Sequence, residues 1–125
     1  MNLLEETTRV IKENGKRVSG VLWVGNSKAR TTWNKFAPIA NIDYDSGFGG
    51  TEVSEDLLVV GKDWWLERHE YDGSEWWEFK TLPVKPKKLI KLKALTMGQA
   101  RAAGHGYFYG GDGLEHINGN ENVSL

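Results

Sequence analysis

The chain has 125 residues, no cysteine and a formal net charge of −1. This length fits one domain of ordinary size, and the absence of cysteine excludes disulfides, thiolate zinc sites and cysteine nucleophiles. No apolar run approaches the ~20 residues of a membrane span. The acidic start lacks the basic and apolar regions of a signal peptide. We therefore expect a cytoplasmic protein that contacts no membrane.

Charge is unevenly distributed along the chain. Residues 41–80 contain 11 acidic and 3 basic residues, whereas the rest of the chain contains 6 acidic and 13 basic residues. Two interpretations remain open: a folded surface with one acidic side, or charges that mix in space once the chain folds.

The first 40 residues predict helix, strand and helix. Residues 2–14 have a capping Asn2 and an apolar stripe at helical spacing, and Gly15 ends the helix. Residues 21–24 are a short apolar run that predicts a strand. A second short helix follows, which Thr31 or Thr32 caps and Pro38 limits. The stripe of the first helix consists of Leu3, Leu4, Thr7, Val10 and Ile11.

A glycine-rich loop over residues 43–50 leads into a β-region, and we expect its Tyr44 and Phe48 to lie on the domain as lids. Three strands are predicted over residues 57–60, 64–71 and 74–80. Asp72-Gly73 between the last two is a strong hairpin signal, because both turn positions need positive φ.

The C-terminal third predicts one more strand and one more helix. Residues 88–95 alternate as a fourth strand after Pro83 and Pro86, and Thr96 caps a short helix through Ala103, which Gly104 ends. The expected fold is α+β: an antiparallel β-meander of three to five strands packed with two or three short helices. We expect a single domain over residues 1–125, with helix-strand-helix over 1–40, an acidic loop and antiparallel sheet over 41–95, and a short helix and glycine-rich tail over 96–125.

A two-residue turn at Asp72-Gly73 fixes the hairpin register, so that Tyr71 faces Ser74 and Trp65 faces Lys80. Side chains alternate between two faces. One face is expected to join the core, with Arg68 stacked on Trp77 at its edge; it consists of Trp64, Leu66, Arg68, Trp77 and Phe79. The other face mixes aromatic and charged residues; it consists of Trp65, Glu67, His69, Tyr71, Trp76, Glu78 and Lys80.

The mixed face has two interpretations. It is either an aromatic cluster that shields the sheet or a contact surface for a partner, since Trp and Tyr are enriched at binding hot spots. Glu70 opposite Glu75 suits a cationic partner. The candidate partner-binding residues are Trp65, Glu67, His69, Tyr71, Trp76 and Glu78, with the acidic residues Asp43, Asp45, Glu70 and Glu75.

No catalytic motif is present, so we expect no enzyme and no cofactor. The histidines His69, His105 and His116 lack zinc-ligand spacing, but a small metal-binding protein or enzyme that uses them stays an alternative, with Asp112 close enough in sequence to join His105. The lysine run of residues 85–93 fits an edge strand protected against pairing better than a nucleic-acid contact, because it contains no arginine or aromatic residue.

Residues 1–80 resemble small uncharacterised proteins of phages and prophages. The resemblance rests on the N-terminal Leu-Leu-Glu-Glu helix, on residues 44–50 and on residues 70–78. It implies a phage accessory protein, and among these the anti-CRISPR inhibitors. The resulting hypothesis is a non-catalytic, protein-binding inhibitor of a CRISPR effector nuclease, present as a monomer or homodimer and without direct nucleic-acid contact. The alternative is a phage structural or accessory module that self-associates through its sheet.

Overall fold

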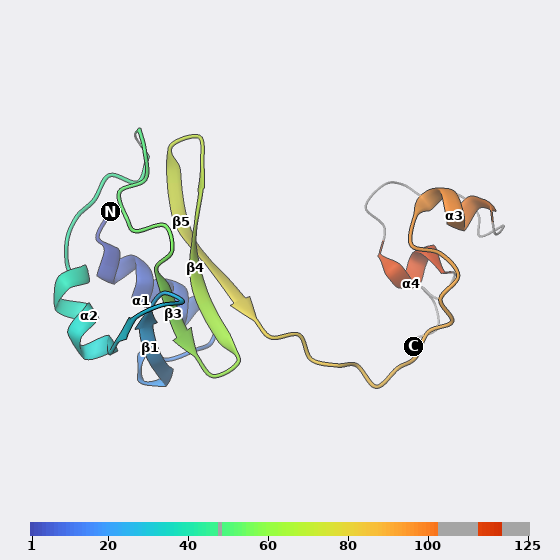
Figure 1. The fold of residues 1–125 in the computed structure, drawn as a ribbon, viewed down its shortest axis with the longest axis horizontal. Helices are drawn as coiled ribbons and strands as arrows, with labels where there is room; N and C mark the ends of the chain where they lie inside the picture. Colours follow the sequence, from blue (N-terminus) through green and yellow to red (C-terminus); the bar gives the residue numbers. More distant parts are fainter. Residues whose placement is uncertain (48, 103–112, 119–125) are drawn as a thin grey trace. The chain divides into compact units, whose positions relative to one another are not determined.

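A computed structural model describes residues 1–47, 49–102 and 113–118, apart from the side chain of His116 (Figure 1). The sequence predicts one domain, whereas the structure divides the chain into two compact units, Met1–Pro83 and Val84–Leu125. Within the described ranges, no helix is both long enough and apolar enough to cross a membrane.

The first unit is a five-stranded antiparallel sheet with two α-helices, which confirms the predicted α+β class. The strand order is β2-β1-β3-β4-β5. The two-residue strand β2 has no counterpart in the sequence pattern. In chain order the elements are α1 (Leu3–Glu13), a short 3-10 turn (Val18–Gly20), β1 (Val21–Gly25), β2 (Arg30–Thr31), α2 (Trp33–Ala40), β3 (Leu58–Gly61), β4 (Trp64–Tyr71) and β5 (Ser74–Thr81).

The β4–β5 hairpin has the predicted turn and register. Asp72 and Gly73 have φ values of 50° and 84°, as a two-residue turn of this kind requires. The paired residues run from Tyr71 with Ser74 to Trp64 with Thr81 without a bulge. The side chains of the two strands are therefore assigned to the two faces of the sheet as predicted.

Both helices begin at the expected caps. The Asn2 side chain accepts a hydrogen bond from the Glu5 N–H at 3.0 Å, and Thr32 accepts one from the Lys35 N–H at 3.3 Å. Pro38 lies inside α2, which ends two residues later. The α1 stripe faces inward, since Leu3, Thr7 and Ile11 are buried and Leu4 and Val10 pack against the core.

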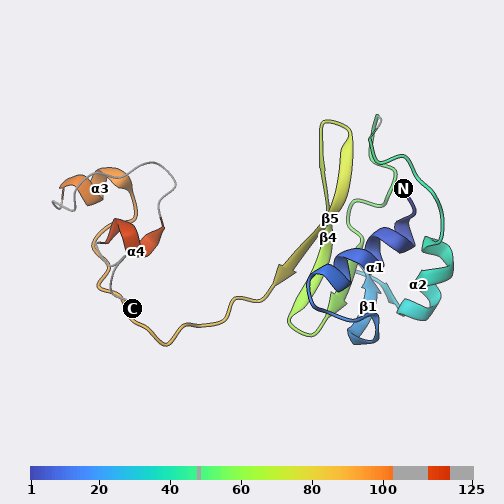
Figure 2. The same cartoon turned by 180° about the vertical axis from the view of Figure 1, so that it is seen from behind.

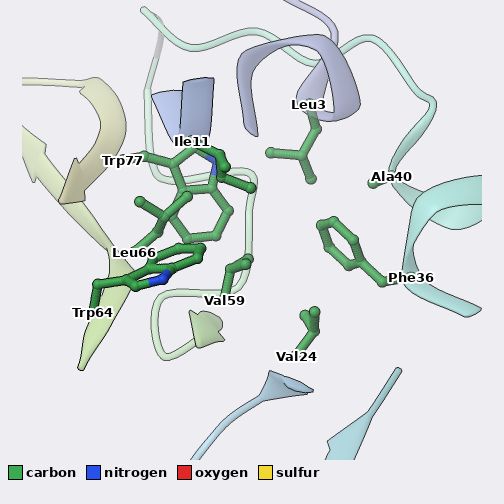
Figure 3. Close-up of a cluster of buried hydrophobic side chains, with 9 residues drawn as sticks. All are labelled: Leu3, Ile11, Val24, Phe36, Ala40, Val59, Trp64, Leu66 and Trp77. Atoms are coloured by element: carbon green, nitrogen blue, oxygen red, sulfur yellow. The ribbon is translucent and has the colours of Figure 1, made fainter. Parts of the chain in front are cut away.

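One face of the sheet carries the core of this unit. Figure 2 shows α1 in front of the strands with α2 beside it. Figure 3 shows how Leu3 and Phe36 from the helices meet Val24, Leu66 and Trp77 from the sheet. Full burial of one such side chain contributes about 1.5–3 kcal/mol to folding. The predicted core face of the hairpin is thus confirmed.

The second unit contains two short helices, α3 (Met97–Ala102) and α4 (Leu114–Ile117). Thr96 caps α3 as predicted: its Oγ1 accepts from the Gln99 N–H at 3.1 Å, and the Gln99 side chain accepts from the Thr96 N–H at 3.2 Å. The expected end of this helix at Ala103 and Gly104 lies outside the described residues.

The predicted strand over residues 88–95 is wrong. These residues are in no strand or helix. Alternating side chains favour an extended backbone, but a strand also needs a partner for its N–H and C=O groups. Near the end of the segment, the N–H groups of Lys93 and Ala94 instead donate to the Asn118 side chain, at 2.6 and 2.8 Å.

Candidate functional site

The second face of the sheet in the first unit carries the mixed aromatic and charged residues. Along the strands, the residues of this face alternate with the buried Val24, Val59 and Leu66, whose side chains point to the opposite face. The buried helical residues of the core cluster all pack on that opposite face. We call the second face the open face; it consists of Trp23, Leu58, Val60, Trp65, Glu67, His69, Tyr71, Trp76, Glu78 and Lys80.

A row of polar contacts crosses the open face. Trp65 Nε1 donates to Glu67 Oε1 at 2.7 Å, and His69 Nε2 lies 2.8 Å from Glu67 Oε2. The other ring nitrogen, His69 Nδ1, lies 3.1 Å from Glu78 Oε2, and Lys80 Nζ lies 3.4 Å from Glu78 Oε1. A neutral imidazole can donate to one carboxylate only, whereas a protonated ring donates to both. We call these five side chains the polar row.

The polar row holds Glu67 in its ionised form. The hydrogen bond from the Trp65 indole, followed by that from His69, holds the pKa of Glu67 below its ordinary value. Hydrogen bonds to the charged form of a carboxyl group favour that form. The open face therefore keeps a fixed negative charge next to an indole ring.

The aromatic residues at the hairpin end of this face are accessible. Trp76 lies directly opposite His69 and is 36% exposed, and Tyr71, beside the turn, is 77% exposed. Trp65 is half-buried. Rigid aromatic side chains beside fixed charges provide a large contact area at little cost in conformational entropy. The structure thus brings together all six hairpin residues that the sequence singled out.

The four acidic candidates are not equivalent. Asp43, Asp45 and Glu70 are exposed, whereas Glu75 is buried and lies on the core face. The expectation that Glu75 meets a cationic partner is therefore wrong. It was based on Glu75 facing Glu70, which the register confirms, but an internal cation already holds the Glu75 carboxylate.

That cation is Arg68, whose side chain is only 3% exposed. Arg68 Nη2 lies 2.9 Å from Glu75 Oε1 and Nη1 lies 3.5 Å from Glu6 Oε2. Arg68 Nη2 also donates to Tyr44 Oη at 3.1 Å, and Tyr44 Oη donates to Glu6 Oε1 at 2.6 Å. We call Glu6, Tyr44, Arg68 and Glu75 the buried cluster.

Aromatic rings and backbone groups complete the buried cluster. The guanidinium lies 4.8 Å from the Trp77 ring centroid, which confirms the predicted stacking. The Glu75 carboxylate also accepts from the N–H groups of Glu52 and Val53, at 2.7 and 3.1 Å. The loop residue Tyr44 therefore lies on the domain as expected, whereas Phe48 lies outside the described residues.

The contacts of the buried cluster shift the pKa values of Glu75 and Tyr44 in opposite directions. Burial opposes ionisation of Glu75, but the two backbone donors, followed by Arg68, hold its pKa below the ordinary value. Burial, followed by the hydrogen bond to Glu6, raises the pKa of Tyr44 to about 12. The sequence placed Arg68 among core residues but contained no local signal for its partners Glu6 and Tyr44, which are distant along the chain.

The described residues give little support to the two alternative sites, a histidine metal site and the lysine run of residues 85–93. Among the residues that the structure describes, no three His, Asp or Glu side chains are arranged to hold a metal ion. His105 and Asp112 lie outside that set. The lysine run is exposed, and Lys88 pairs with Glu115 at 3.3 Å. Comparisons with protein-family models, curated proteins and solved structures found no match.

Proposed function

We propose that this chain is a non-catalytic protein-binding module whose open face docks a partner protein with cationic side chains. The observation that carries the proposal is the polar row, which includes Trp65 and has Trp76 directly opposite its His69. Its groups are already bonded to one another, so that they are held in place before a partner arrives. Such preorganisation lowers the entropy lost on binding.

The charge of the surface supports a cationic partner. Arg68 and Glu75 neutralise each other in the interior. Leaving both aside, residues 41–80 keep ten acidic and two basic residues, so that segregation of charge persists outside the core. Asp45, Glu70 and Asp72 are exposed near the hairpin turn. Complementary charge speeds encounter and selects among partners.

The resemblance to phage proteins extends the proposal to the identity of the partner. An acidic aromatic surface can occupy the cationic channel in which a defence nuclease holds its nucleic acid. On this basis we propose that the partner is a CRISPR effector nuclease and that docking blocks its loading.

A direct binding assay tests the proposal. The purified chain is immobilised and exposed to a guide-RNA-loaded CRISPR nuclease, and target cleavage is measured with excess chain in solution. We expect capture and loss of cleavage. Replacing both Trp65 and Trp76 with alanine should weaken binding by roughly tenfold or more, since hot-spot residues carry most of the interaction energy.

The matched control is Ile39→Ala, because Ile39 is a large apolar residue that is 75% exposed on α2, away from the open face. It should leave capture and cleavage inhibition unchanged. Circular dichroism of each variant shows whether the fold is retained. Absence of capture together with full cleavage at excess chain would reject the nuclease as partner.

A further inference from the structure

On the side of β5 away from β4, most backbone groups face no other strand among the described residues. Tyr71 and Ser74 close a two-residue turn, so they form a hydrogen-bonded pair, and such pairs alternate along the hairpin. Residues 75, 77, 79 and 81 therefore direct their N–H and C=O groups away from β4. The Glu75 N–H follows this rule, because it donates to Ser46 O at 3.0 Å on that side.

The free part of this edge is short and has clear ends. The loop at Ser46 occupies one end, and Pro83, which has no N–H, lies beyond the other. Between them lie Trp77, Phe79 and Thr81, with Phe79 at the centre. Among the described residues, no strand pairs with this side of β5. The strand has no proline and no bulge, the features that protect sheet edges from pairing.

The side chains along this edge complement those of a second copy of the same strand that runs antiparallel to it. Trp76, Glu78 and Lys80 lie on the open face. Leu82 continues the same register, since its N–H donates to Asp63 O at 3.0 Å across the hairpin. The order along the edge is therefore apolar, acidic, basic, apolar. Trp76 is 36% exposed and Leu82 is 54% exposed.

We propose that two copies of this chain pair β5 with β5, antiparallel, about a twofold axis at Phe79. In this register Glu78 lies opposite Lys80 of the second copy, and Trp76 lies opposite Leu82 of the second copy, each contact occurring twice. Shifting the axis to Glu78 would place Glu78 opposite its own copy, and shifting it to Lys80 would place two lysines together. Like charges directly opposite each other destabilise a strand pair.

The pairing also satisfies the free backbone groups. Three facing pairs form, namely Phe79 with Phe79 and Trp77 with Thr81 twice. Each facing pair exchanges two N–H···O=C bonds, which gives about six in total. The two five-stranded sheets become one continuous sheet, and the two open faces join on one side of it. Because a strand pair this short buries less than a standard interface, association depends on concentration.

Mass measurement on the full chain tests the proposal. Sedimentation velocity and light scattering over a concentration series should show a shift from monomer to dimer. Thr81→Pro should abolish the shift, because it removes an outward N–H while breaking no bond to β4. Thr81 is exposed. A chain that stays monomeric at the highest attainable concentration overturns the proposal.

Charge variants test the register. Glu78→Lys places two lysines opposite each other, and Lys80→Glu places two glutamates opposite each other, so each variant alone should be monomeric. A mixture of the two should dimerise, since the acidic pair of one chain then meets the basic pair of the other. Lys62→Glu is the matched control, because Lys62 is exposed in the β3–β4 turn and this substitution makes the same charge change as Lys80→Glu at a site away from β5. This variant should dimerise as the unmodified chain does.

Cross-linking gives a readout that does not depend on charge. The chain has no cysteine, so engineered thiols are unique. Glu78 and Lys80 of the second copy form a non-hydrogen-bonded pair, in which side chains approach closely enough for a disulfide. Mixing E78C and K80C chains of different mass should give a mixed disulfide dimer on oxidation. Dimers that survive Thr81→Pro and both charge changes, with no mixed disulfide, would place the interface elsewhere and refute this pairing.

Discussion

Replacement of Arg68 with methionine should strongly destabilise the first unit. Methionine keeps the length and apolar character of the side chain but removes the cation that lies between Glu6 and Glu75. Both carboxylates then stay in the interior, with Glu75 bound only by the N–H groups of Glu52 and Val53 among the described residues. The cation–π contact with Trp77 is lost as well.

The magnitude follows from the burial of the cluster. Side-chain exposure is 3% for Arg68, 4% for Glu6 and 2% for Glu75, so solvent screens these charges little. Removing one partner of a buried ion pair costs about 3–5 kcal/mol. We expect a loss of this size in the free energy of unfolding at neutral pH.

Urea unfolding followed by tryptophan fluorescence measures this loss. The triple variant Glu6→Gln, Arg68→Met, Glu75→Gln is the informative companion, because it removes all three charges and should recover part of the stability. A loss below about 1 kcal/mol for Arg68→Met would match an exposed ion pair instead, and would refute the argument that this cluster is buried and coupled.

The pKa shifts and one close packing contact give further predictions. The pKa of Glu75 is lowered in the folded state, so its contribution to the free energy of unfolding is present above the ordinary glutamate pKa and is lost as pH falls through the folded value. Glu75→Gln should therefore flatten the acid side of a stability–pH curve measured by urea unfolding. The pKa of Tyr44 is raised to about 12, so its contribution to the free energy of unfolding is present below the ordinary tyrosine pKa and is lost as pH rises towards 12. Tyr44→Phe should remove that loss of stability at alkaline pH and the corresponding step in phenolate absorbance. Trp65→Phe removes the donor that lowers the pKa of Glu67, and NMR titration of the carboxyl carbon should show that pKa rising towards its ordinary value. A methyl group at Gly61 would overlap the Trp64 ring, so thermal melting of Gly61→Ala should show a loss of about 1–3 kcal/mol.

The sequence predicts the hairpin well because local chemistry specifies it. Asp72-Gly73 fixes the turn, and strict alternation then assigns each side chain to a face. Prediction ends where an interaction joins distant parts of the chain. Nothing near Arg68 indicates Glu6 or Tyr44. Likewise, nothing near Glu75 indicates the N–H groups of Glu52 and Val53 that bind its carboxylate, and these contacts are part of why Glu75 is buried.

The two strand errors have different physical causes. The alternating run over residues 88–95 specifies an extended backbone but supplies no neighbouring strand, so it forms none. Strand β2 has only two residues, Arg30 and Thr31, too few for any periodic pattern to appear. In both cases the deciding factor is whether another segment is available for pairing, and that is a property of the whole fold.

The anchoring of Glu75 has a consequence for how this unit opens. Its carboxylate ties the N–H groups of Glu52 and Val53, in a loop rich in glycine, to a strand in the sheet. We expect hydrogen exchange of these two amides to be slow while they stay bonded to the carboxylate, which is also bound to Arg68. We therefore expect this glycine-rich loop to belong to the same cooperative unit as the hairpin and to open together with it.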